Sequence, residues 1–183
     1  VAVPLDAMLP MEDLTDLINR SDSEALFLSP KNQGLLEGIL AGCPNLKKIW
    51  FLQEETTEFS VERVASFGKL KEEGRGSKGA SERPEAGDTA TIIFTSGTTG
   101  KSKGVMLTQA SNVLSVDFEA EPGTVILSVL PIHHAFCLVM DWLKGFSLGA
   151  TVCINDSLMH MVKNMGIFKP EIILMVPLMV ETI

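Results

Sequence analysis

The chain has 183 residues, of which 45% are hydrophobic and 21% charged, and it carries a net charge of −8 at pH 7. A chain of this length can bury a substantial core, while its acidic balance argues against nucleic acid as a partner, because phosphate backbones need a basic surface. The longest apolar run, IILMVPLMV at 172–180, is far shorter than the roughly 20 residues of a membrane-spanning helix.

The first 70 residues alternate short apolar runs with helix-like segments. Strands are predicted over 1–5, 24–29 and 46–52, and helices over 10–21, 31–42 and 60–70. The first helix begins after Pro10, and Glu12 and Asp13 in its first turn suit a helix N-terminus. This order indicates a mostly parallel sheet that is covered by helices.

Residues 71–88, KEEGRGSKGASERPEAGD, differ in composition from their surroundings. Nine of the eighteen are charged, four are glycine and none is a large apolar residue. Such a segment buries too little surface to offset the entropy lost on ordering. We therefore predict a linker or mobile loop at 71–88, between a unit at 1–70 and a second unit at 89–183.

The second unit repeats the alternation of strands and helices. Strands are predicted over 90–95, 104–108, 124–130, 150–154 and 171–176, and helices over 109–118, 135–149 and 157–166. In the helix at 135–149, Trp142, Leu143 and Phe146 are predicted to face the core, and Asp141 and Lys144 the solvent. The predicted fold class is α/β, with mostly parallel sheets flanked by helices.

The two ends and the cysteines add two expectations. The chain opens inside an apolar stretch and stops at VPLMVETI, which is typical of a helix that has just begun, so we expect a piece of a larger protein.

Cys43, Cys137 and Cys153 lie among apolar neighbours without CxxC spacing. Buried free thiols of this kind are expected in a reducing compartment, which indicates the cytoplasm.

The segment FTSGTTGKSKG, residues 94–104, is rich in glycine and hydroxyl side chains and follows a predicted strand. Its GKS resembles the end of a Walker A loop, GxxxxGK[ST], but the first glycine of that motif falls on Thr95. A Walker A loop also leads into a helix, whereas the residues after Gly104 predict a strand. We therefore expect a hairpin tip that holds phosphate through successive backbone N–H groups.

In its strand context, IIFTSGTTGKSKGVMLT resembles the signature [FY]TSG[ST]TGxPKG of the AMP-forming acyl- and aryl-adenylating enzymes. The chain departs from the signature at Ser102, where proline is usual, and at Gln109, where histidine is usual. Three further stretches resemble the same family, and the weakest resemblance is at 54–88. These stretches are VAVPLDAMLPMEDLTDLINRSDSEALFLS, LSVLPIHHAF and FKPEIILMVPLMVETI.

The resemblance implies a partial N-terminal domain of an acyl-adenylating enzyme, and a role for each loop residue. The hydroxyls and amides of the loop would grip the β- and γ-phosphates of ATP, Thr98 would sit beside Mg²⁺, and Lys103 would be the loop lysine. The residues predicted to bind ATP are Thr95, Ser96, Gly97, Thr98, Thr99, Gly100 and Lys103. His134 matches the histidine beside the carboxylate pocket, and it follows a predicted strand at the edge where parallel sheets bind ligands.

The implied reaction adenylates a carboxylic acid with Mg·ATP and passes the acyl group to CoA. The HHAF form of the pocket motif favours a fatty acid as substrate, and we expect Lys103 and His134 to act in the catalysis. Peripheral membrane association of the full-length protein is a further expectation. The family's adenine, ribose and C-terminal lysine motifs have no match in these residues, so the 183-residue chain is predicted to be inactive alone.

Two other functions remain open at this point. The enzyme could load the acyl group onto a carrier protein instead of CoA. Alternatively, the chain could be a non-catalytic α/β module that binds a nucleotide or another anion.

Overall fold

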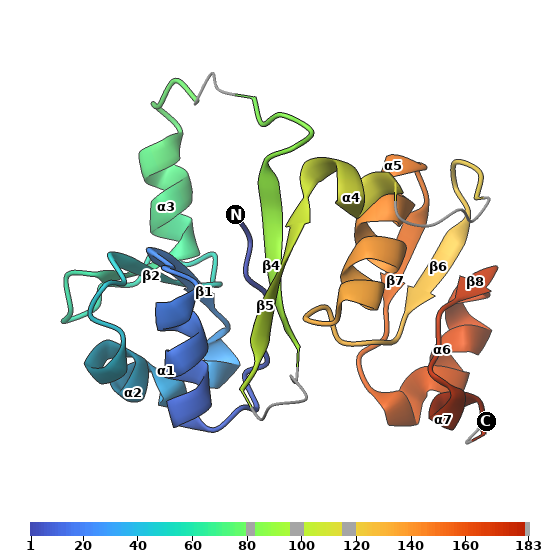
Figure 1. Ribbon diagram of the computed structural model, residues 1–183, viewed down its shortest axis with the longest axis horizontal. Helices are drawn as coiled ribbons and strands as arrows, with labels where there is room; N and C mark the ends of the chain where they lie inside the picture. Colours follow the sequence, from blue (N-terminus) through green and yellow to red (C-terminus); the bar gives the residue numbers. More distant parts are fainter. Residues whose placement is uncertain (80–82, 96–100, 115–119, 182–183) are drawn as a thin grey trace. The chain divides into compact units, whose positions relative to one another are not determined.

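In the computed structural model, residues 1–79, 83–95, 101–114 and 120–181 are described, and they form helices and strands in alternation (Figure 1). The chain divides into two compact units. One comprises Leu5–Arg83, and the other combines Val1–Pro4 with Pro84–Ile183.

The Leu5–Arg83 unit contains a three-stranded parallel sheet in the order β1-β2-β3. Its strands are β1 (Ala25–Leu28), β2 (Lys48–Phe51) and β3 (Val64–Ser66), and its helical segments are α1 (Met11–Arg20), η1 (Pro30–Leu35), α2 (Leu36–Gly42) and α3 (Phe67–Gly74). η1 is a 3₁₀ turn that leads directly into α2. The core joins α1, α2 and the sheet through buried residues that include Leu14, Ile18, Leu28, Ile39, Ile49, Phe51 and Val64.

Two predictions in the first 70 residues are wrong. Residues 60–70 are not one helix: Val64–Ser66 form β3 and α3 begins at Phe67, because three consecutive buried residues suit a strand covered on both faces. The Ser66 hydroxyl then caps α3 by accepting a hydrogen bond from the backbone N–H of Lys69 at 3.2 Å. Residues 1–5 form only an isolated bridge between Ala2 and Thr91, since Pro4 has no N–H to continue a ladder.

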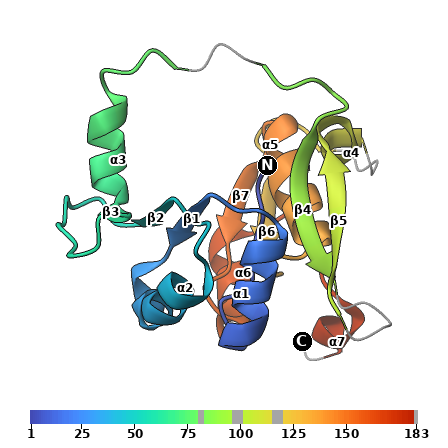
Figure 2. The same ribbon diagram turned by 60° about the vertical axis from the view of Figure 1, so that its left-hand side comes forward.

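The second unit contains an antiparallel hairpin and a three-stranded parallel sheet. The hairpin pairs β4 (Thr89–Thr95) with β5 (Lys103–Thr108), and Figure 2 shows the two strands side by side in opposite directions, with α4 (Gln109–Leu114) following β5. The sheet has the order β7-β6-β8 and is formed by β6 (Val125–Ser128), β7 (Thr151–Ile154) and β8 (Ile172–Ile173).

Helices cover the β7-β6-β8 sheet. The helical segments are η2 (Cys137–Lys144), α5 (Gly145–Ser147), η3 (Leu158–His160), α6 (Met161–Phe168) and α7 (Pro177–Val180). The connection from β6 to β7 and the connection from β7 to β8 run in opposite directions across the sheet, so right-handed crossovers put η2 and α6 on opposite faces. The central strand β6 is the most buried, with Ile126 and Leu127 fully enclosed.

These observations confirm the predicted α/β class, in which mostly parallel sheets are flanked by helices. The antiparallel hairpin β4–β5 is the exception among the described strands. Within the described residues, no helix combines the length and the apolar character needed to cross a membrane.

Candidate active site

The glycine-rich segment lies between two paired strands, as predicted. Thr95 ends β4 and stands opposite Lys103, which begins β5, and both residues are exposed at the mouth of the hairpin. The residue after the loop thus enters a strand and not a helix, which is incompatible with a Walker A loop. The structure therefore brings together a threonine and a lysine that the sequence assigned to phosphate binding.

Gly104, next to Lys103, is closely packed across the hairpin. It pairs with Phe94, and a Cβ at this position would lie 3.1 Å from Ile92 Cγ2 and 3.3 Å from Phe94 Cε1. These distances are tighter than nine in ten real Cβ contacts, so a larger residue here requires the two side chains to shift. A glycine opposite an aromatic residue lets the ring lie across the strand, which fixes the register beside the loop.

The other loop residues of the prediction, Ser96, Gly97, Thr98, Thr99 and Gly100, lie outside the described residues. The described flanks fit a phosphate, because a lysine ammonium and a threonine hydroxyl both donate hydrogen bonds to anionic oxygens. Mg²⁺ prefers oxygen ligands, and the one assigned to it from the sequence, Thr98, is among the residues not described.

His134 lies in a tight turn at the carboxyl end of β6, the central strand of its sheet, as predicted. Its backbone N–H donates to the carbonyl of Pro131 at 3.0 Å, and its own carbonyl accepts from the N–H of Leu138 at 3.0 Å, at the start of the helix. The side chain is exposed, and its ring centroid is 4.6 Å from that of His133. Ligands of parallel sheets bind at this edge. His134 thus belongs to a different sheet from Thr95 and Lys103.

The helix after His134 departs from the expected geometry. Cys137–Lys144 form a π-helix, which closes hydrogen bonds from residue i to i+5 and so holds more residues per turn than an α-helix. The prediction of a solvent-facing Asp141 is wrong, because the wider turn brings its side chain to the sheet, where it is fully buried. Phe146, predicted to be in the core, is 58% exposed, while Trp142 and Leu143 are half-buried.

A polar cluster that the sequence prediction missed follows the neighbouring strand β7. Asn164 Nδ2 donates to Asn155 Oδ1 and to Asp156 Oδ1, both at 2.8 Å, and His160 Nδ1 lies 2.8 Å from Asp156 Oδ2. These hydrogen bonds, that of His160 first, lower the pKa of Asp156. The cluster ties α6 to the end of β7. The asparagine and aspartate directly after a predicted strand were the signal that could have revealed it.

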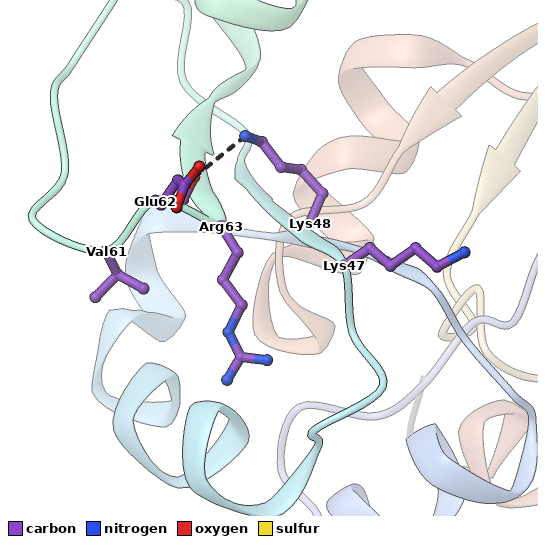
Figure 3. Close-up of a pocket in the computed structure, with 5 residues that line it drawn as sticks. All are labelled: Lys47, Lys48, Val61, Glu62 and Arg63. Carbon is purple, nitrogen blue, oxygen red and sulfur yellow. Dashed lines mark hydrogen bonds between the residues drawn. The ribbon is translucent and has the colours of Figure 1, made fainter.

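A shallow hollow of about 430 Å³ lies in the Leu5–Arg83 unit and is lined by Lys47, Lys48, Val61, Glu62 and Arg63 (Figure 3). Its cationic groups are already engaged. Arg63 donates to the carbonyls of Leu40, Cys43 and Leu46, at and just after the end of α2. Lys47 pairs with Glu24, and Lys48 donates to the carbonyl of Glu62. Arg63 therefore stabilises a helix C-terminus, and we assign no ligand to this hollow.

Metal-binding clusters were also considered. In the part of the chain that the structure describes, no three His, Cys, Asp or Glu side chains gather as metal ligands. All three cysteines are free thiols, as predicted, and Cys43 and Cys137 are buried.

The fold matches that of solved adenylate-forming enzymes. The anthranilate CoA ligase AuaEII, crystallised with anthranoyl-AMP, superposes with a TM-score of 0.77 over 94% of this chain and 34% of its own, at 17% sequence identity. At this identity the likeness establishes the fold alone. The chain thus has the α/β fold of part of that ligase.

Sequence comparison identifies the family. The chain matches the family "AMP-binding enzyme" over residues 1–183, and it belongs to that family. It is 29% identical over 188 residues to long chain acyl-CoA synthetase 7, peroxisomal, of Arabidopsis thaliana, covering 97% of this chain and 27% of the relative. It is 35% identical over 104 residues to the long-chain-fatty-acid–[acyl-carrier-protein] ligase AEE15, chloroplastic, of the same plant, covering 54% of this chain and 14% of the relative. The chain thus spans about a quarter or less of the length of these relatives.

Proposed function

We propose that this chain is part of a longer AMP-forming acid–thiol ligase that acts on a long-chain fatty acid. In the first half-reaction the carboxylate attacks the α-phosphorus of ATP, giving acyl-AMP and pyrophosphate. In the second, the thiol of CoA attacks the acyl carbon and AMP leaves. The observation that carries the proposal is the family match along the whole chain, with the signature loop placed between β4 and β5.

The described residues have distinct roles in this proposal. The Lys103 ammonium, at the mouth of the hairpin opposite Thr95, offsets the negative charge that builds on the departing pyrophosphate. The Thr95 hydroxyl and the loop amides orient the β- and γ-phosphates. His134, at the carboxyl end of β6, lies beside the fatty-acid carboxylate. Mg²⁺ would supply charge neutralisation on the phosphates, with Thr98 as the chain's residue beside it.

The two lysines near the loop provide a matched test in the full-length ligase. Lys103→Ala is expected to lower kcat for fatty-acid-dependent ATP–pyrophosphate exchange by about 100-fold, as removal of one charge-stabilising donor does in other enzymes. Lys101→Ala, two residues away and equally exposed, is the control and is expected to retain most of the exchange. Equal losses in the two variants would contradict the role of Lys103.

The 183-residue chain alone is expected to bind ATP weakly and to catalyse no exchange, since the family's adenine and ribose motifs have no match in its residues. Measurable ATP–pyrophosphate exchange by this chain would contradict that expectation. A full-length protein that binds ATP but shows no exchange with any carboxylate would instead favour a non-catalytic nucleotide-binding module.

A carrier protein is the second candidate for the acyl acceptor. One relative is named as a ligase for acyl-carrier protein, and its similarity covers about half of this chain. Supplying the full-length enzyme with acyl-AMP and either free CoA or a phosphopantetheinyl carrier protein separates the two acceptors. We propose a cytoplasmic enzyme on the basis of its three free thiols, and peripheral membrane association can be tested by co-sedimentation with lipid vesicles.

A further inference from the structure

Asp141 is fully buried next to the connection that carries His134. Its side chain lies on η2 with Cys137, also fully buried, and both face Ser128 at the end of β6. Both groups are buried by contacts within this unit.

The hydrogen bonds of this cluster reach the His134 turn through Cys137. Cys137 Sγ lies 3.0 Å from the carbonyl oxygen of Leu130, 3.4 Å from Ser128 Oγ and 3.7 Å from Asp141 Oδ2. Trp142 Nε1 donates to Ser128 Oγ at 3.1 Å. The carbonyl of Leu130 directly precedes the turn at Pro131–His134. The bond from Cys137 therefore anchors the base of that turn.

The thiol has one hydrogen and three possible acceptors, Ser128 Oγ, Leu130 O and the Asp141 carboxyl. Ser128 Oγ already accepts from Trp142, so Leu130 O and Asp141 are the main competitors. If Asp141 is neutral, its own O–H serves the cluster and the thiol is left to donate to Leu130. If Asp141 is ionised, the carboxylate attracts the thiol hydrogen more strongly than a carbonyl does, because charge-assisted hydrogen bonds are the stronger ones. The protonation state of Asp141 thus decides whether the turn keeps its anchor.

We propose that Asp141 is a positioning residue, which as a neutral carboxylic acid leaves Cys137 free to anchor the turn that presents His134. The inference rests on the proposed function for the role of His134, but the anchoring itself does not. Asp141 acts through Cys137 and the backbone of residues 129–136.

The surroundings of Asp141 favour the neutral form. Among the described residues, no hydrogen-bond partner reaches Asp141 Oδ1. Of the described elements, β6, α4 and α5 have the most contacts with η2, and their segments VILS, QASNVL and GFS contain no charged or titratable side chain. Cys137 is the titratable group whose hydrogen bond to Asp141 the structure shows. Burial raises the pKa of Asp141, and the hydrogen bonds from Ser128 and Cys137 oppose that rise.

The test compares Asp141→Asn, which stays neutral at every pH, with Cys137→Ala, which removes the thiol that donates to Leu130. Glu121→Gln, at an exposed loop position of the same unit, is the control for losing one carboxyl. Amide hydrogen exchange in the 183-residue chain is followed at the N–H groups of His134 and Leu138, which close the turn and begin the helix. Protection factors relative to intrinsic exchange are measured from acidic to alkaline pH.

Cys137→Ala is expected to lower the protection of these two amides by about tenfold, the size of one lost hydrogen bond, while amides in β7 keep theirs. Wild type should lose the same protection as pH rises through the folded pKa of Asp141, and Asp141→Asn should keep it. Equal protection in wild type and Cys137→Ala overturns the proposal. A uniform loss throughout the unit, or an Asp141→Asn that behaves like Cys137→Ala, also overturns it.

A second measurement in the full-length ligase links the anchor to His134. Cys137→Ala is expected to raise KM for the fatty acid by about tenfold and to leave KM for ATP unchanged, since β4 and β5, which flank the phosphate loop, form a separate hairpin. Equal increases in both constants overturn the link to His134. If the exchange data agree but no carboxylate is adenylated by wild type, the proposed function fails while the anchoring of the turn stands.

Discussion

Replacing Gly68 with alanine is expected to destabilise the Leu5–Arg83 unit by about 2 kcal/mol. A Cβ on Gly68 would lie 2.0 Å from the backbone oxygen of Glu54, about 1.4 Å short of the 3.4 Å at which ordinary contact begins. The strand-end backbone cannot simply retreat, because the Gly68 N–H donates to the carbonyl of Gln53 at 3.0 Å. Overpacking of this kind destabilises the folded state by up to about 3 kcal/mol. Alanine also restricts the unfolded chain more than glycine does, which stabilises the fold by up to about 1 kcal/mol and offsets part of that cost.

Gly74→Ala is the matched control, since it makes the same change in the same helix, α3. Nothing lies within 4 Å of its added Cβ, so this variant is expected to be stabilised by about 0.4–1 kcal/mol. Urea unfolding followed by Trp50 fluorescence in a Trp142→Phe background reports on this unit, because Trp50 lies in β2. Equal urea midpoints and slopes for the two variants would refute the steric argument.

Three further predictions concern the second unit. The pKa of Asp141 is raised in the folded chain, so the free energy of unfolding should fall as pH rises above about 4. The fall should be up to about 1.4 kcal/mol per pH unit and should stop once pH passes the folded pKa. Asp141→Asn should lack this fall when urea unfolding is measured at a series of pH values. The pKa of Asp156 is lowered chiefly by its hydrogen bond to His160. The ionised Asp156 therefore stabilises the fold at neutral pH, and this stabilisation is lost as pH falls through the folded pKa. His160→Ala should raise the pKa of Asp156 in an NMR titration, and an unchanged pKa would contradict the assigned cause. Ile126→Ala, in the fully buried centre of β6, should cost about 2–5 kcal/mol, whereas Ile154→Ala, 62% exposed on β7, should cost less than about 1 kcal/mol; similar costs would argue against β6 as the core strand.

The sequence predicted the hairpin around the glycine-rich segment because the signals for it are local. An apolar strand, a glycine-rich segment and a second strand specify a hairpin without reference to the rest of the fold, and the paired Thr95 and Lys103 agree with it. The position of His134 at a strand end was predictable for the same reason. The apolar runs at 24–29, 46–52 and 150–154 likewise sufficed for the α/β class.

Only the tertiary structure decided which polar groups are buried and which short segments pair. A helical periodicity of 3.6 residues placed Asp141 in solvent, and the π-helix turned it inward against Ser128. Val64–Ser66 became a strand because β2 offered it a parallel partner, and Ala2 pairs with Thr91, far away in sequence. Local propensity carries no information about such distant partners. The sequence therefore determined most of the elements and the hairpin, while long-range packing determined the strand Val64–Ser66 and the buried acid next to the His134 turn.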